Sequence, residues 1–246
     1  MTREPRRLHV IGACMPKAGS MTLADSFSPT YRTAHEAGIR RLLAYQGEHL
    51  RGEMSRGRQV ALMMARDAEV DAEVDAITSL WMWREAVVEA FPEAHFAMSF
   101  REPESWSRSL ALQFIRFSTS SDESLRADFA LVALRLWMSV DSEAQADDVG
   151  QDFAALASDY WLRAATEQLL FPPERSTYID MHQMEHGLVR LEQQLGLASG
   201  TVNVAAHSHI RPADQQIPAV LDVALRDAFG SEHYALLEQL QARAQE

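Results

Sequence analysis

The feature that most constrains this chain is a short apolar segment near its start that ends at a turn containing lysine and glycine. Residues 8–14 are apolar and typical of a buried strand, and Pro16, two residues beyond them, ends the segment. A helix is predicted from residue 20. The first amides of a helix have no intrahelical acceptor, so a strand that turns into a helix makes an anion site, to which a lysine adds positive charge. The predicted anion-binding residues are Pro16, Lys17, Ala18, Gly19, Ser20, Met21 and Thr22.

The rest of the chain alternates between strand-like and helix-like segments. Further strands are predicted at 30–34, 95–100 and 176–180, and helices at 20–27, 35–50, 79–90, from 101 onward, at 188–197 and at 217–244. Apolar residues show no clear helical or strand spacing at 59–73. Residues 124–170 are predicted to be largely helical, with a break at the acidic stretch 141–152. This alternation predicts an α/β fold in which helices flank a parallel sheet.

Composition narrows the possible partners and location. The 246 residues carry a formal net charge of −12 and contain no linker-like stretch, so we expect a single domain, 1–246, that binds neither nucleic acid nor an anionic membrane. A single cysteine excludes an intramolecular disulfide, and no segment approaches the ~20 apolar residues of a membrane helix. With no apolar stretch typical of a signal peptide at the start, the sequence predicts a cytoplasmic protein.

The lysine turn differs from the phosphate loop of nucleoside triphosphatases. That loop places its lysine directly after a glycine and before a serine or threonine that binds magnesium. Here Lys17 precedes Gly19, and Ala18 follows the lysine. The turn is therefore suited to a phosphate without a bound metal, and no metal site is expected.

Two motifs resemble those of PAPS-dependent sulfotransferases. Pro-Lys-x-Gly-Ser after the first strand is similar to their 5′-phosphosulfate loop. In that family an arginine at a strand end and a serine eight residues later hold the 3′-phosphate of the donor, and Arg101 and Ser109 match this pattern. A guanidinium suits this task because it binds phosphate in a bidentate manner.

The likeness covers about residues 7–36, 75–115 and 175–245. It includes Phe-Pro-Glu-Ala at 91–94, Arg-Glu-Pro-Glu-Ser-Trp at 101–106, and a strand end at Tyr178. The resemblance implies a P-loop-like sulfotransferase fold with a helical insertion around 116–174. It also implies that Tyr178 stacks on adenine, although a packed core tyrosine fits the pattern nearly as well. The sequence departs from the family at Met21, where a second threonine is usual, and Arg211 is the nearest substitute for the C-terminal Arg-Lys-Gly.

The resemblance implies transfer of a sulfuryl group from PAPS to a hydroxyl or amine of a small molecule, with release of PAP. Lys17 would stabilise the leaving oxygen, and a base would accept the proton of the acceptor. His35 is the first candidate because imidazole titrates near neutrality, and Glu36 and Asp75 follow. Glu36 can also be read as a carboxylate favoured in the first turn of a helix.

Two alternatives remain open. One is a relative of the same fold that binds a nucleotide or anion without catalysing transfer, consistent with Met21. The other is a zinc hydrolase that uses His182 and His186, which lie four residues apart on one predicted helical face.

Overall fold

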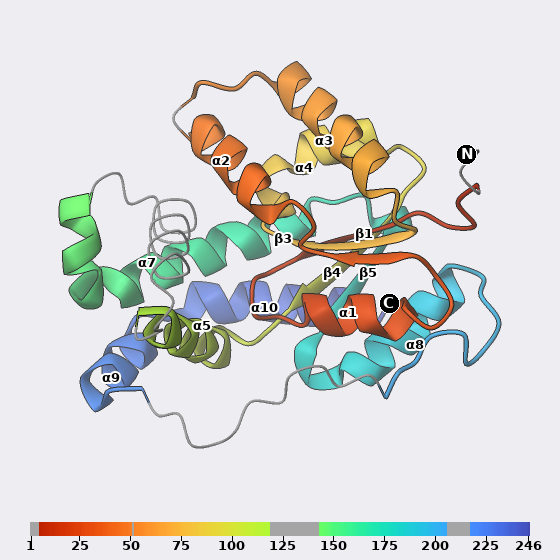
Figure 1. Ribbon diagram of the computed structural model, residues 1–246. Coiled ribbons are helices and arrows are strands. Elements are labelled where there is room, and N and C mark those ends of the chain that lie inside the picture. Colours follow the sequence, from red (N-terminus) through yellow and green to blue (C-terminus); the bar gives the residue numbers. More distant parts are fainter. Residues whose placement is uncertain (1–4, 51, 119–142, 206–216) are drawn as a thin grey trace.

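The computed structural model describes residues 5–50, 52–118, 143–205 and 217–246. At its centre is a five-stranded sheet with the strand order β2-β3-β1-β4-β5 (Figure 1). All of the paired strands run parallel, which confirms the predicted α/β fold. The strands are β1 (Val10–Cys14), β2 (Thr33–His35), β3 (Val74–Thr78), β4 (His95–Phe100) and β5 (Ser176–Asp180).

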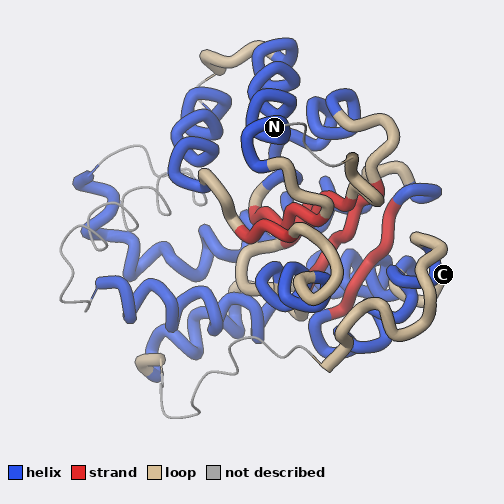
Figure 2. The backbone as a smooth tube through the Cα atoms, turned by 45° about the vertical axis from the view of Figure 1, so that its right-hand side comes forward, coloured by secondary structure: helices blue, strands red, loops and turns tan. Residues whose placement is uncertain are grey.

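Helices cover both faces of the sheet (Figure 2). On one face, apolar residues of α1 and α8 pack against β1, β3 and β5. The larger core lies on the other face, where α3, α4, α5, α7 and α10 contribute apolar side chains. The helices are α1 (Ser20–Phe27), α2 (Ile39–Leu50), α3 (Arg56–Val70), α4 (Arg84–Ala90), α5 (Pro103–Ser118), α7 (Glu143–Leu169), α8 (Met184–Gln194), α9 (Ala219–Asp227) and α10 (Ser231–Arg243), and the 3-10 turns are η1 (Leu80–Trp83), η2 (Pro173–Arg175) and η3 (Met181–Gln183).

Strand β1 lies in the middle of the sheet, and each of its five residues is buried. Gly12 lets α1 approach it closely. A Cβ atom at this position would lie 2.8 Å from Leu23 Cδ2 and 3.0 Å from the Cα atom of Ala76 on β3. The glycine in the apolar strand therefore sets the distance between α1 and the sheet, which in turn positions the turn that joins them.

Helix α7 is part of the main core. Its Tyr160 and Trp161 are almost fully buried, and Gln168 Nε2 donates a hydrogen bond to the carbonyl of Ala13 at 2.8 Å. Within the predicted insertion, the described residues are helical at the end of α5 and throughout α7, and a short turn at 170–172 follows. The predicted break at 141–152 is wrong from residue 143 onward, because acidic residues alone do not end a helix and this stretch holds good helix formers and no proline.

Other boundaries also differ from the predictions. Strand β2 starts at Thr33, and the next helix starts at residue 39 because Glu36 and Gly38 adopt positive φ angles of 51° and 67°. The ambiguous stretch 59–73 falls mostly within α3, and α8 begins four residues earlier than predicted. The predicted C-terminal helix is divided into α9 and α10 near Gly230. Within the described ranges, no helix combines the length and apolar character needed to cross a membrane.

Candidate functional site

The candidate site lies at the carboxyl ends of two neighbouring strands, β1 and β4. These strands pair in parallel, with Gly12 opposite Ala97. Helix α1 follows β1 onto one face of the sheet, whereas α5 follows β4 onto the other. Open α/β sheets bind ligands where neighbouring strands send their helices to opposite faces. Lys17 follows one of these strands and Arg101 follows the other, so the fold brings the two predicted anion-binding segments to the same point of the sheet.

The turn after β1 is held by hydrogen bonds on both sides. The amide of Met15 donates to Ser99 O at 3.1 Å, and the amide of Ala18 donates to Met15 O at 3.2 Å. From α5, Trp106 Nε1 donates to the carbonyl of Pro16 at 2.6 Å. Lys17 has a left-handed φ of 62°, which turns the backbone sharply before the helix. The turn is therefore a fixed element, tied directly to the segment that carries Arg101.

Gly19 precedes the first residue of α1 and has a φ of 89°. A Cβ atom here would lie 2.3 Å from Met184 Cε and 2.7 Å from Met181 Sδ, so the position also lacks space for a side chain. Glycine provides no side-chain acceptor for the first helical amides, and no hydrogen bond from a cap side chain is found. The amides at the start of α1 are therefore available to an external acceptor.

Ser20 and His35 are brought together. Ser20 Oγ lies 3.0 Å from His35 Nε2, although β3 separates β2 from β1 in the sheet. The contact forms because α1 packs across β2 and β3. Ser20 is 7% exposed and His35 is half-buried. The first candidate base therefore contacts the predicted phosphate-binding turn.

Glu36 lies beside this pair but makes different contacts. Its amide donates to Ala76 O at 3.0 Å, and its Oε1 accepts a hydrogen bond from Thr78 Oγ1 at 2.9 Å. Thr78 is opposite Cys14 at the end of β1. Glu36 therefore belongs to the same end of the sheet as the lysine turn. It precedes α2, so the reading that placed its carboxylate in the first helical turn is wrong.

Asp75 is set apart from these residues. Its carboxylate forms a buried ion pair with Arg66 of α3, and the same guanidinium donates to Ala37 O at 2.8 Å. Asp75 is opposite Ile11, three positions before the end of β1, so it lies about 10 Å along the sheet from the turn. These contacts give Asp75 a role in attaching α3 to the sheet and leave it outside the candidate site.

Arg101 follows β4 and is oriented by the start of α5. Its Nε donates to Ser105 Oγ, and its carbonyl accepts a hydrogen bond from Trp161 Nε1 at 3.0 Å. Ser109 lies one helical turn beyond Ser105, so both hydroxyls lie on the same side of α5. Ser105 was not among the predicted residues, although its position four residues after Arg101 and four before Ser109 was a usable signal.

Tyr178 is a core residue. Its side chain is 3% exposed within the main hydrophobic core, and its hydroxyl donates to Gln168 O at 2.9 Å. Burial raises the pKa of this phenol to about 12. A ring packed in this way cannot stack on a ligand, so the core alternative describes Tyr178 correctly. Arg211, the other peripheral candidate, lies outside the described residues.

The zinc alternative gains no support from the geometry. His182 and His186 are both exposed at the start of α8 and its preceding turn. Over the described part of the chain, no group of three or more histidine, cysteine, aspartate or glutamate side chains is arranged to hold a metal. A catalytic zinc needs three protein ligands, so this pair is insufficient.

An aromatic layer that was not predicted from the sequence lies behind the turn. Trp106 stacks on Tyr160 with ring centroids 5.6 Å apart and planes 9° from parallel. The Tyr160 hydroxyl lies 3.0 Å from Ser79 Oγ and accepts a hydrogen bond from Trp81 Nε1 at 3.3 Å. Burial raises the pKa of Tyr160 well above its ordinary value, so the hydroxyl stays protonated. The layer links the ends of β1 and β3 to α5 and α7.

Comparison of the chain with protein-family models and with curated proteins finds no match. Two basic residues, Lys17 and Arg101, follow adjacent strands, and the helix-start amides lie beside one of them. This combination can bind two anionic groups, with the Ser20–His35 pair positioned to exchange a proton.

Proposed function

We propose that this chain is a sulfotransferase that uses PAPS as donor, transfers the sulfuryl group to a hydroxyl or amine of a small molecule and releases PAP. The observation that carries the proposal is the arrangement of Lys17 and Arg101 after the neighbouring strands β1 and β4. PAPS has a 5′-phosphosulfate and a separate 3′-phosphate, so it needs two anion-binding groups on a single nucleotide. The lysine turn serves the first and Arg101 with Ser105 and Ser109 serves the second.

In the proposed reaction the acceptor oxygen attacks sulfur while the bond between sulfur and the bridging phosphate oxygen breaks. Negative charge develops on that bridging oxygen, where the Lys17 ammonium stabilises it. The amides of Gly19, Ser20 and Met21 hold the group being transferred. His35 accepts the proton of the acceptor hydroxyl, and its bond to Ser20 aligns the imidazole with the turn.

The proposal requires no metal ion. Lys17 and the helix-start amides provide the positive potential that magnesium provides in triphosphatases, and Ala18 stands where a magnesium-binding hydroxyl would be needed. We therefore expect turnover to continue in the presence of EDTA.

Calorimetry with PAP is the direct test, and AMP, which lacks the 3′-phosphate, is the matched ligand control. We expect PAP to bind at least tenfold more tightly than AMP, because the Arg101 contact is charge-assisted. Absence of PAP binding would reject the proposal. PAPS turnover is then measured with a panel of aromatic and aliphatic hydroxyl acceptors. PAP binding without turnover on any of them would favour the nucleotide-binding relative that does not catalyse transfer.

A further inference from the structure

The two anion-binding segments of the candidate site differ in how their helices begin. No side chain caps the start of α1, so its first amides are available to an external acceptor. At the start of α5, by contrast, the carboxylate of Glu102 accepts hydrogen bonds from the amides of Glu104 and Ser105, at 3.0 and 2.8 Å. The segment after β4 therefore relies on side chains to bind an anion, chiefly on the guanidinium of Arg101, and its affinity depends on how Arg101 is held.

Trp161 of α7 holds the backbone of this second segment. Because the amide of Ser105 bonds the side chain of Glu102, it leaves the carbonyl of Arg101 to another donor. That donor is Trp161 Nε1, at 3.0 Å. The indole is fully buried, so an Arg101 carbonyl that lost this bond would be left without a partner away from water, which is costly.

Trp106 of α5 has the corresponding place at the lysine turn. Its Nε1 donates to the carbonyl of Pro16 at 2.6 Å, directly before Lys17, whose φ of 62° is strained for a residue with a side chain. Such strain persists only where surrounding contacts fix the backbone. The Trp106 ring is fully buried and stacks on Tyr160, which fixes the direction of its N–H.

We propose that Trp106 and Trp161 are positioning residues with separate tasks. The indole N–H of Trp106 shapes the site for the 5′-phosphosulfate, and the indole N–H of Trp161 shapes the site for the 3′-phosphate. This inference rests on the proposed function, because it assigns the two segments to the two anionic groups of PAPS. Tyr160 and Trp161 are consecutive residues of α7, and they contact Trp106 and Arg101, respectively. A single helix therefore fixes the spacing of the two anion sites.

Calorimetry with three nucleotides separates the two tasks. PAP carries both phosphates, 5′-AMP carries only the 5′-phosphate, and 3′-AMP carries only the 3′-phosphate; the two mononucleotides are measured by displacement of PAP. In Trp106→Phe, we expect 5′-AMP and PAP to bind about fivefold more weakly, the effect of losing one hydrogen bond, and 3′-AMP to stay within twofold of the original protein. In Trp161→Phe, we expect 3′-AMP and PAP to bind about fivefold more weakly and 5′-AMP to stay within twofold.

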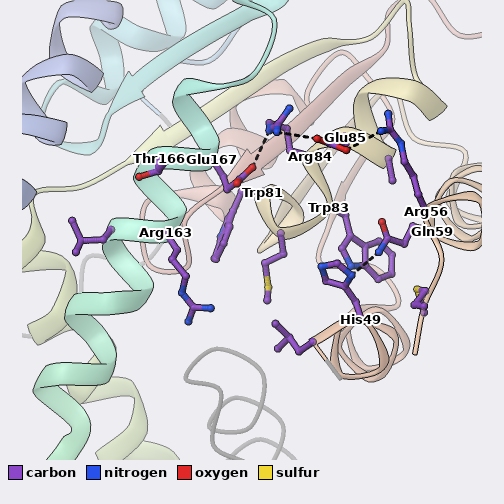
Figure 3. A pocket seen from close by; sticks show the side chains of 15 residues that line it. His49, Arg56, Gln59, Trp81, Trp83, Arg84, Glu85, Arg163, Thr166 and Glu167 are labelled. Atoms are coloured by element: carbon purple, nitrogen blue, oxygen red, sulfur yellow. Dashed lines mark hydrogen bonds and ion pairs between the residues drawn. The ribbon is translucent and has the colours of Figure 1, made fainter. Parts of the chain in front are cut away.

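Trp83→Phe is the matched control, because it makes the same substitution in the same core. Trp83 is 2% exposed, and its indole N–H bonds neither segment. It lines a pocket of about 580 Å³ between α2, α7 and the η1–α4 segment, to whose wall neither Trp106 nor Trp161 contributes (Figure 3). We expect the affinities of Trp83→Phe for all three nucleotides to stay within twofold of the original protein.

Urea unfolding establishes that each variant is folded. Where phenylalanine prevents folding, Trp106→Met and Trp161→Met fill the space with a flexible apolar chain that has no N–H. Unchanged affinities, or equal losses for all three nucleotides, would show that the two indoles act through packing alone. Either result would overturn the assignment and leave PAP binding, and with it the proposed function, intact. Failure of the original protein to bind PAP would reject the proposed function and this inference together.

Discussion

Ser20 Oγ and His35 Nε2 lie 3.0 Å apart, which joins the first residue of α1 to the last residue of β2. The bond connects a residue that would contact the transferring group to one that would accept a proton. An imidazole aligned in this way loses less entropy on reaching the reacting geometry. In the proposed reaction, the pair therefore links donor binding to activation of the acceptor.

Removing the imidazole tests this role. In His35→Gln, we expect kcat with a working acceptor to fall about 10²–10⁴-fold, the usual contribution of a general base. PAP affinity should change less than threefold. A pH–rate profile should lose the limb that reports the base. His186→Gln, at an exposed histidine of α8, is the control and should turn over normally. If Glu36→Gln removes the limb and His35→Gln does not, Glu36 is the base.

Lys17 is expected to act mainly on the transition state. Negative charge grows on the bridging oxygen only as the bond to sulfur breaks, so the interaction is stronger then than in the ground state. We expect Lys17→Ala to lower kcat by about 10²–10³ while PAP affinity falls far less. Alanine and lysine are equally strained at the φ of 62°, so the backbone contribution cancels. A near-normal rate in this variant would disprove the mechanism.

Arg101 is expected to act on donor affinity instead. Loss of a charge-assisted phosphate contact in Arg101→Gln should weaken PAP binding by about 2 kcal/mol and leave AMP binding unchanged. Arg108→Gln, in the helix α5 that follows Arg101, is the matched control. Arg108 pairs with Asp222 at 2.8 Å and is 40% exposed, so its loss should leave PAP affinity within twofold of the original protein. Equal effects of the two changes would remove Arg101 from the site.

Much of the fold could be predicted because four of the five strands have clear sequence signals, whereas β3, which pairs with β1 and β2, was not predicted. The predicted strands at 95–100 and 176–180 match β4 and β5 residue for residue, and a proline or glycine marks several helix ends. Helix α3 was not predicted because Arg66, a charged residue, lies on its buried face, where it forms an ion pair with Asp75. The buried face is therefore not marked by apolar residues alone, as it is in most surface helices. A pattern of hydrophobicity cannot reveal a partner on another element.

The candidate site was predictable to the extent that its residues follow strand ends. Lys17 was predicted from the strand–turn–helix pattern, and Arg101 from the resemblance of its motif to that of sulfotransferases. Parallel strands place their carboxyl ends along one edge, which brings the two segments together. Tyr178 also lies near a strand end, but its side chain points into the core, and alternation along a fully buried strand cannot distinguish the two faces. The contact between Ser20 and His35 depends on how α1 crosses the sheet, which no local pattern specifies.

Gly19 is expected to be essential to the shape of the turn. Gly19→Ala imposes strain at a φ of 89° and a clash with the side chains of Met181 and Met184. Gly196→Ala is the matched control because its φ is 66° and nothing lies within 4 Å of an added Cβ atom. We expect both to be destabilised by about 1 kcal/mol from strain, and Gly19→Ala by about 1–3 kcal/mol more. If the two variants have equal midpoints of urea unfolding, then Met181 and Met184 move aside without destabilising the fold.

The last prediction concerns Glu73, a fully buried carboxylate that joins the segments before β1 and β2. It accepts hydrogen bonds from the backbone and side chain of Arg7 and from the amide of Arg32, at 2.8–2.9 Å. Chiefly through the Arg7 side-chain bonds, these contacts lower the pKa of Glu73 from 4.5 to about 2. A carboxyl whose pKa is lower in the folded state stabilises the fold above its unfolded pKa. That stabilisation is lost as the pH falls through the folded pKa.

Glu73→Gln should therefore lower the free energy of unfolding by about 2 kcal/mol at pH 7. This magnitude discounts the full effect of the pKa shift because Arg7 is 55% exposed to solvent. The difference from the original protein should persist down to about pH 5 and shrink between pH 5 and pH 2, as Glu73 becomes protonated in the original protein. Urea unfolding followed by circular dichroism at pH 7, 5 and 3 measures it. Glu69→Gln is the control. It removes an ion pair between Arg41 and Glu69, whose side chain is 62% exposed, and should lower the free energy of unfolding by less than about 0.5 kcal/mol. If the Glu73→Gln difference is the same at all three values of pH, the buried carboxylate acts through packing and its charge contributes nothing.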